Sequence, residues 1–342
     1  MPEKSSTVEA PVVDAERAEP FATDQDYRAA AEQARSASAA YYAGEDQTVD
    51  DATYDGLIAR MQATEAAHPE WKTADSPTAV VAAGAAPVGD VVHAAPMLSL
   101  DNVFDEPGLR AWAARLDKLV GTPVSDYVVE PKIDGLAISA IYTDGVLVRI
   151  ATRGDGRAGE DVTGQARLVA GLPPKLSRPE SLEVRGEVFM TDADFEVANE
   201  RRTGAGEPAF ANPRSAAAGS LRAVRAYDVP LSFFAYAAPD LDAAAADRHS
   251  GALAYLEGLG IATTAGSSAG LIACADIDAV LAAVAGLGGN RAGLGFGIDG
   301  AVIKADRYAE QQAAGSGSRA PRWGIAFKFP ADTRTTKLIG IE

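Results

Sequence analysis

The sequence is poor in the residues that form disulfides or bind metals, with one cysteine, Cys274, and three histidines among 342 residues. A single thiol cannot form an internal disulfide, and no Cys/His group has the spacing of a zinc site. His68, His93 and His249 are scattered along the chain, so we expect them to be structural or exposed.

Long apolar runs are also missing. No run approaches the roughly 20 residues that a membrane-spanning helix needs. Residues 1–20 are acidic and polar, without the apolar core of a secretory signal. We therefore expect a cytoplasmic protein with no membrane partner, whose residues 1–22 form a disordered leader.

Basic residues are scarce as well. The chain has 31 Lys and Arg against 48 Asp and Glu, which gives a net charge of −17. A protein that binds nucleic acid on its own normally presents a basic face. Either DNA is not a partner, or the main contact with DNA lies outside this sequence. Arg214 and Arg222 belong to a local basic cluster that solvated surface explains equally well.

Helical spacing predicts two helices near the N-terminus, over residues 26–43 and 51–68, and Pro69 ends the second. A Pro/Ala/Gly-rich linker follows over residues 74–87. From Tyr127 the pattern changes to strands, with a hairpin of 137–142 and 146–151 around Asp144-Gly145. Further strands at 182–190, 231–236 and 301–305 and helices at 105–120, 192–201 and 276–287 predict an α+β fold with mainly antiparallel sheet.

Lys132 lies in the most informative motif, Glu130-Pro131-Lys132-Ile133-Asp134-Gly135, directly after an apolar run. Covalent nucleotidyltransferases present an amine nucleophile to a phosphate in this setting. The motif alone is weak evidence, since Lys-x-Asp-Gly arises by chance in about one chain in twelve of this length. The remainder of the chain must therefore supply a nucleotide pocket.

Gly154, Gly156 and Gly159 form a G-x-G-x-x-G pattern that suggests a Rossmann dinucleotide site and a dehydrogenase. We interpret it differently, because the preceding strand is the second arm of a hairpin and not a buried parallel strand. The loop then lets the backbone approach a ligand, and Arg153 becomes a candidate nucleotide contact.

Charged residues on predicted strands extend the candidate pocket. Glu187 lies on one strand, Asp299 precedes a strand that contains Lys304, and Lys328 lies between two aromatic residues. Lysine is rarely buried without a partner, and a phosphate would be one. Solvent-exposed glutamate and snorkelling lysines are the alternative.

The N-terminal helices carry an aromatic and acidic cluster that suits a cationic aromatic ligand or, alternatively, a helical core with acidic caps. Its members are Tyr41, Tyr42, Asp51, Tyr54 and Asp55.

A further ordered series of motifs is Asp75-Ser76-Pro77-Thr78, Pro96-Met97-Leu98-Ser99-Leu100-Asp101-Asn102, Thr152-Arg153-Gly154-Asp155-Gly156, Arg185-Gly186-Glu187, Phe210-Ala211-Asn212-Pro213-Arg214, Ala217-Ala218-Gly219-Ser220-Leu221-Arg222 and Arg319-Ala320-Pro321-Arg322-Trp323. With the Lys132 motif, this order resembles the N-terminal half of bacterial NAD-dependent DNA ligases over about residues 23–342. The resemblance implies an ATP-grasp-like nucleotidyltransferase core over 88–332. It also implies a helical nicotinamide mononucleotide recognition subdomain with its linker over 23–87, and the start of an oligonucleotide-binding domain over 333–342.

In such a ligase, Lys132 would attack the α-phosphate of NAD and expel nicotinamide mononucleotide, and Asp134 would orient the amine or a water bound to Mg²⁺. Lys304 and Lys328 would hold the phosphate, and no protein residue would ligate the metal directly. The resemblance implies nucleotide contacts from Ser99, Leu100, Glu130, Arg153, Glu187, Tyr236 and Asp299. It implies contacts to the nicotinamide mononucleotide half from Tyr41, Tyr42, Asp51, Tyr54 and Asp55, and contacts to the DNA 5′-phosphate from Arg214 and Arg222.

The proposed reaction needs an unprotonated amine, whereas free lysine has a pKa of about 10.4. We expect a cage of cations around Lys132, from Lys304, Lys328, Arg153 and bound Mg²⁺, to keep that amine neutral. The same cations would stabilise the transition state of phosphoryl transfer.

The chain departs from the family pattern at Gln165, Ser215, Ala223, Ala237 and Gly297. Several of these flank the segment with Arg214 and Arg222, so we expect the later steps on nicked double-stranded DNA to be impaired. The expected protein is a monomeric fragment that self-adenylates but seals nicks poorly or not at all. The alternatives are a degenerate paralogue that binds NAD without reacting, an NAD-dependent dehydrogenase and an ATP-dependent ligase.

Overall fold

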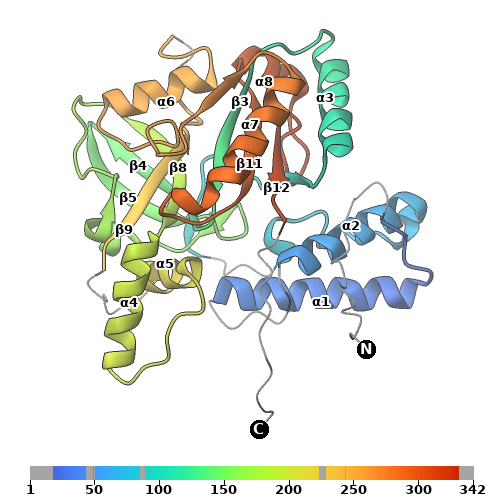
Figure 1. The fold of residues 1–342 in the computed structure, drawn as a ribbon, viewed down its shortest axis with the longest axis horizontal. Helices are drawn as coiled ribbons and strands as arrows, with labels where there is room; N and C mark the ends of the chain where they lie inside the picture. Colours follow the sequence, from blue (N-terminus) through green and yellow to red (C-terminus); the bar gives the residue numbers. More distant parts are fainter. Residues whose placement is uncertain are drawn as a thin grey trace, which may run out of the picture.

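The computed structural model describes residues 18–43, 49, 51–84, 89–222, 229–242 and 244–330. Two helices, α1 (Asp24–Ala43) and α2 (Asp51–Ala67), pack together at one side of the molecule, apart from the strands (Figure 1). Tyr27, Ala34 and Met61 are buried between them. The helices predicted near the N-terminus are thus confirmed. The predicted leader and the start of a further domain at 333–342 lie largely or wholly outside the described residues.

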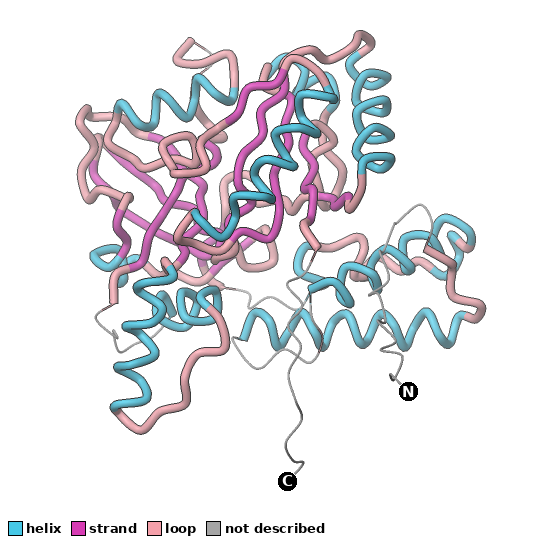
Figure 2. Tube along the Cα trace, viewed as in Figure 1, coloured by secondary structure: helices cyan, strands magenta, loops and turns pink. Residues whose placement is uncertain are grey.

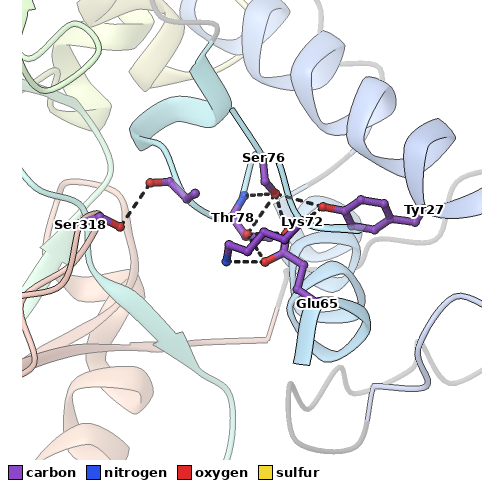
Figure 3. Close-up of polar contacts among 7 residues, drawn as sticks. Tyr27, Glu65, Lys72, Ser76, Thr78 and Ser318 are labelled. Carbon is purple, nitrogen blue, oxygen red and sulfur yellow. Dashed lines mark hydrogen bonds and ion pairs between the residues drawn. The ribbon is translucent and has the colours of Figure 1, made fainter. Parts of the chain in front are cut away.

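A buried carboxylate ties the segment after α2 back onto these helices (Figure 3). Glu65 accepts hydrogen bonds from Tyr27 Oη at 2.8 Å, Lys72 Nζ at 2.6 Å and Ser76 Oγ at 2.5 Å, and also from Thr78 Oγ1. A buried carboxylate is stable when its oxygens are this well satisfied. The Asp75-Ser76-Pro77-Thr78 motif therefore anchors the start of the predicted linker. The short 3-10 helix η1 (Pro69–Trp71) precedes that linker, and η2 (Val81–Gly84) lies within it.

The remaining described residues form two five-stranded sheets and a two-stranded one (Figure 2). The first sheet has the order β10 (Ile272–Cys274), β3 (Tyr127–Ile133), β11 (Ile298–Ala305), β12 (Gly324–Lys328) and β2 (Asp101–Val103). The second has the order β5 (Val146–Thr152), β4 (Leu136–Thr143), β8 (Leu182–Phe189), β9 (Leu231–Ala237) and β7 (Val169–Ala170). Strands β1 (Val91–Val92) and β6 (Ala158–Gly159) form the small sheet.

Within the two large sheets, β2 with β12 and β7 with β9 are parallel and the other pairs are antiparallel. The fold is therefore α+β with mainly antiparallel sheet, as predicted. The hairpin of β4 and β5 is also confirmed, and its turn has Asp144 and Gly145 at positive φ, which is typical of a tight hairpin turn.

Helices cover the outer faces of the sheets. Helices α3 (Glu106–Val120) and α7 (Ile277–Asn290) pack with the first sheet, and α5 (Pro213–Arg222) and α6 (His249–Gly258) pack with the second. Helices α4 (Asp192–Gly204) and α8 (Tyr308–Ala314) and the 3-10 helices η3 (Thr163–Leu168) and η4 (Arg291–Gly293) complete the described elements. Asp105 caps α3 and Asp276 caps α7, each accepting from a backbone N–H of the first turn.

The chain crosses from the first sheet to the second at Asp134-Gly135, between β3 and β4. A Cβ at Gly135 would lie 2.3 Å from the carbonyl oxygen of Val188, so only glycine fits this crossing. The Lys-x-Asp-Gly motif therefore has a structural reason for its glycine, and Lys132 projects near the junction of the two sheets. None of the helices in the described part of the chain is long and apolar enough to cross a membrane.

Candidate active site

A cavity of about 800 Å³ lies between the two sheets and the helical subdomain. Its lining includes Tyr54 and Asp55 from α2, Lys132 from β3, Glu187 from β8 and Lys328 from β12. Ser99, Leu100, Arg153, Arg214, Tyr236, Asp299 and Lys304 also line it. Residues that the sequence analysis singled out from distant segments thus meet around one space. The backbones of Tyr41, Tyr42 and Asp51 belong to α1 and α2, but their side chains lie outside the described part of the structure.

Strand register arranges the cavity floor in rows across the first sheet. Lys132 is paired with Gly300, and Gly300 with Lys328, so both lysines lie on one face in one row. A Cβ at Gly300 would lie 2.2 Å from the carbonyl oxygen of Phe327, and the glycine leaves the space between the lysines open. Glu130 occupies the next row, opposite Val302, and Lys304 the row after that.

Asp299 joins the two lysines of the first row. A register shift between Ile298 and Gly300 interrupts the ladder at this residue, and such bulges re-aim side chains. Lys132 Nζ and Lys328 Nζ each donate to Asp299 Oδ2 at 2.9 Å. Burial alone would raise the pKa of Asp299, but the two ammonium groups outweigh it and lower that pKa to about 2. The Lys132 side chain is 25% exposed, so it faces the cavity and not bulk solvent.

The helical subdomain reaches the same row through Asp55. Its Oδ2 lies 3.3 Å from Lys328 Nζ, and Asn102 Nδ2 donates to its Oδ1 at 3.0 Å. Acidic and basic groups therefore alternate from α2 to the candidate nucleophile. The expected cage of cations around Lys132 is interleaved with carboxylates, because a buried ammonium group needs a compensating charge.

Lys304 has a separate environment at the far end of the floor. Its Nζ lies 2.7 Å from Glu130 Oε1, 3.0 Å from His249 Nε2 and 3.2 Å from the carbonyl oxygen of Tyr236. Two residues along a strand span about 6.6 Å, so the backbones of the Lys304 and Lys132 rows lie roughly 13 Å apart. The structure thus places Lys328, and not Lys304, beside Lys132.

His249 is the functional candidate that the sequence analysis missed. It is buried, lines the cavity and has its Nε2 at 2.6 Å from Glu130 Oε1, while Thr264 Oγ1 donates to Glu130 Oε2. His249 is therefore buried and not exposed, and its place in the cavity lining makes it a candidate for a role at the site. No local pattern identifies it, because 119 residues separate it from Glu130.

Glu187 faces the cavity from β8, and its neighbour Gly186 has no room for a side chain against Phe233. Burial raises the pKa of Glu187 to about 8, although Arg153 and Lys132 act in the opposite direction. Burial also raises the pKa of Tyr236, on the adjacent strand β9. A carboxyl group that is mostly neutral at pH 7 can donate as well as accept a hydrogen bond.

The two arginines expected to contact DNA differ in position. Arg214 donates to Asp134 Oδ1 at 2.9 Å, and burial lowers its pKa to about 10. Arg222 forms an ion pair with Glu160 at 2.8 Å and is not part of the cavity lining. The structure therefore brings Arg214, but not Arg222, to the motif that carries Lys132.

The departures from the family pattern lie at different distances from the cavity. Ala237 lines it, and the carbonyl oxygen of Gly297 accepts from the backbone N–H of Asp134 at 3.0 Å. Ser215 lies in the first turn of α5 and Gln165 in η3, whereas Ala223 lies outside the described residues. Two of the five thus adjoin the site. In the described residues no group of three or more His, Cys, Asp or Glu side chains could hold a metal ion.

Comparison with known proteins agrees with this geometry. Residues 86–332 match the model of the NAD-dependent DNA ligase adenylation domain, and residues 21–82 match that of the DNA ligase-like, N-terminal NAD+-binding domain. The chain belongs to the NAD-dependent DNA ligase family. The family assignment made from the motifs is thereby confirmed.

Two relatives in this family show how much of such a ligase the chain represents. The chain is 49% identical to DNA ligase 2 of Streptomyces coelicolor, a match that covers 92% of this chain and 46% of that relative. It is 42% identical to the DNA ligase of Anoxybacillus flavithermus, covering 91% and 46%. The chain therefore spans about half the length of the curated relatives that it matches.

Proposed function

We propose that this ligase chain transfers AMP from NAD to Lys132. The observation that carries the proposal is that Lys132 and Lys328 converge on Asp299 at the floor of a cavity closed by the helical subdomain. Lys132 Nζ attacks the α-phosphorus of NAD, and a nitrogen–phosphorus bond forms. The bond from that phosphorus to the bridging oxygen breaks, and nicotinamide mononucleotide leaves with the electron pair on its phosphate.

The side chains around Lys132 have roles in this step. Asp299 Oδ2 accepts a hydrogen bond from Lys132 Nζ at 2.9 Å and holds the amine in position for the attack. Lys328 shares that carboxylate and stabilises the negative charge that develops on the phosphate. Asp134, held by Arg214, orients the end of strand β3, which carries the nucleophile.

The remainder of NAD extends in two directions from this row. The adenine lies toward Glu130 and Lys304 and stacks on Tyr236, and Glu187 with Arg153 contacts the ribose. The nicotinamide half lies toward Tyr54 and Asp55, so residues 23–87 recognise it and residues 88–332 carry out the adenylation.

Mg²⁺ fits the residues that are present. Asp299 Oδ1 is buried and has no hydrogen-bond partner among the described residues, so it can accept from a water bound to the ion. Mg²⁺ commonly keeps several waters and uses substrate phosphates, so it needs few direct protein ligands. When bound, the ion neutralises charge on the phosphates.

We further propose that, in a complete ligase, the AMP passes to a 5′-phosphate at a nick in double-stranded DNA. These 342 residues, with a net charge of −17, then seal nicks poorly or not at all. We propose that the chain acts as a cytoplasmic monomer, away from membranes.

Intact mass after incubation with NAD and Mg²⁺ tests the adenylation. The chain is expected to gain one AMP, and Lys132→Ala should abolish the gain, whereas Lys118→Ala should retain it because Lys118 is exposed on α3. An unmodified wild-type chain that still binds NAD would support a degenerate paralogue instead. A gain of AMP from ATP alone, or reduction of NAD, would also contradict the proposal.

A further inference from the structure

His249 holds the two charged groups at the inner end of the cavity in a single arrangement. We propose that His249 is a positioning residue that fixes Glu130 as an acceptor and Lys304 as a donor, so that the cavity selects a 6-amino purine over a 6-oxo purine. This inference rests on the proposed function, because it concerns the base of the dinucleotide that donates AMP.

The contacts around His249 determine its hydrogen-bonding role. A carboxylate only accepts and an ammonium group only donates. The separation of 2.6 Å between His249 Nε2 and Glu130 Oε1 therefore requires a proton on Nε2, since two acceptors would repel at that distance. Lys304 Nζ donates to the same oxygen, and this shared target explains why the two nitrogens lie 3.0 Å apart.

The charges of the group agree with this arrangement. Burial, assisted by the positive charge of Lys304, lowers the pKa of His249, so the ring is neutral at pH 7. Burial would raise the pKa of Glu130, but Lys304 and His249 outweigh it and hold that pKa below its ordinary value. A neutral ring that donates keeps the carboxylate in place without competing with Lys304 for charge.

The group leaves hydrogen-bonding capacity for a base. A carboxylate has about four acceptor sites, and His249, Lys304 and Thr264 fill three of those on Glu130 among the described residues. Lys304 has three donors, of which Glu130 and the carbonyl oxygen of Tyr236 take two. One acceptor on Glu130 and one donor on Lys304 thus remain, and both residues line the cavity.

The remaining acceptor of Glu130 and the remaining donor of Lys304 complement the hydrogen-bonding groups of adenine and mismatch those of a 6-oxo purine. The 6-amino group of adenine donates and its N1 accepts, whereas hypoxanthine has an accepting oxygen at position 6 and a donating N1. A 6-oxo base would place its oxygen against Glu130 and its N–H against Lys304, and both groups would be left unpaired. Sites with fixed, buried polar groups discriminate strongly against such a mismatch.

The start of α6 fixes where the ring lies. The backbone N–H of His249 donates to the carbonyl oxygen of Asp306 at 2.8 Å, and Ser250 N and Oγ donate to the Asp306 carboxylate at 2.8 Å each. Asp306 directly follows β11, the strand that carries Lys304. The backbone contact thus docks the helix, and the imidazole makes the separate contact to Glu130.

The test compares NAD with its hypoxanthine analogue in single-turnover self-adenylation, read by intact mass. For His249→Leu we expect the half-saturating NAD concentration to rise roughly 10- to 100-fold, the range for a lost hydrogen bond to a charged group. The maximal rate should change little, and the preference for NAD over the analogue should fall roughly tenfold or more. His249→Gln should restore much of that preference, because its amide N–H can donate to Glu130.

Ser250→Ala is the matched control, since it weakens the docking of α6 without touching Glu130. An unchanged preference in His249→Leu, or an equal loss of preference in Ser250→Ala, would overturn the inference. If His249→Leu does not fold, Thr264→Val removes a different side-chain donor that fixes Glu130 and must lower the preference; a wild-type preference would then refute the idea. Failure of the wild-type chain to react with NAD would instead refute the proposed function.

Discussion

Glu187 allows a quantitative test of the electrostatics of the cavity. Its pKa is about 8 in the folded chain, against an ordinary value of 4.5, because burial disfavours the charged carboxylate. A carboxyl group with a raised pKa contributes a stabilisation that is fully present below pH 4.5 and is lost as the pH rises through 8. At 1.36 kcal/mol per pKa unit, the loss approaches about 5 kcal/mol. This figure is an upper limit, since the half-buried side chain faces the cavity water.

Replacing Glu187 by glutamine isolates this contribution, because the amide has a similar shape and cannot ionise. The free energy of unfolding, measured by denaturant titration between about pH 4 and 9, should diverge between the two proteins as the pH rises. Glu187→Gln should be the more stable protein above pH 8, by up to about 5 kcal/mol, and the two should converge near pH 4.5. Parallel stability curves across that range would refute the assignment of a buried, largely neutral carboxyl group.

Two further substitutions test the row that carries the nucleophile. Asp299→Asn removes the carboxylate that positions Lys132 and Lys328, and single-turnover adenylation at saturating NAD should slow by roughly 100-fold; a wild-type rate would contradict the role of the carboxylate. Gly135→Ala forces a Cβ to 2.3 Å from the carbonyl oxygen of Val188, so thermal unfolding should show a loss of about 1–3 kcal/mol. The control Gly258→Ala has open space at the end of α6 and should be neutral or stabilising, and equal losses in the two variants would discount the close approach.

Local sequence patterns predicted the elements whose signals are contained within a few residues. The hairpin of β4 and β5 follows from alternating apolar residues around Asp144-Gly145, and α3 begins after its Asp105 cap. The strand pattern that begins at Tyr127 is apolar only over residues 127–129, yet strand β3 continues to Ile133. The charged and proline positions of the Lys132 motif conceal that extension, because polar residues on a cavity-facing strand break the apolar pattern.

Long-range pairing was not predictable in the same way. The motif order placed Lys304 and Lys328 together as phosphate contacts, yet the register of β11 and β12 puts Lys328 opposite Gly300 and Lys304 opposite Gly324. A shift of two residues in that register would place other residues opposite the two lysines, although every local motif would stay the same. His249 shows the same limit, since only the folded arrangement of α6 brings it to Glu130.

The alternating acidic and basic side chains around Lys132 also explain why lysines alone are not sufficient to bind NAD. In the row of the nucleophile, the positive charges of Lys132 and Lys328 are balanced by Asp299 and Asp55 before any ligand enters. The pyrophosphate of NAD adds negative charge to a group that is already neutral overall, close to carboxylates that cannot leave the site. Either the Asp55 contact must open or a cation must accompany the phosphates. Asp299 Oδ1, which is buried and has no hydrogen-bond partner within the described part of the chain, suits a hydrated Mg²⁺. The pairing of acidic and basic residues thus balances the charges of the empty cavity, and unless the Asp55 contact opens we expect nucleotide binding to depend on Mg²⁺.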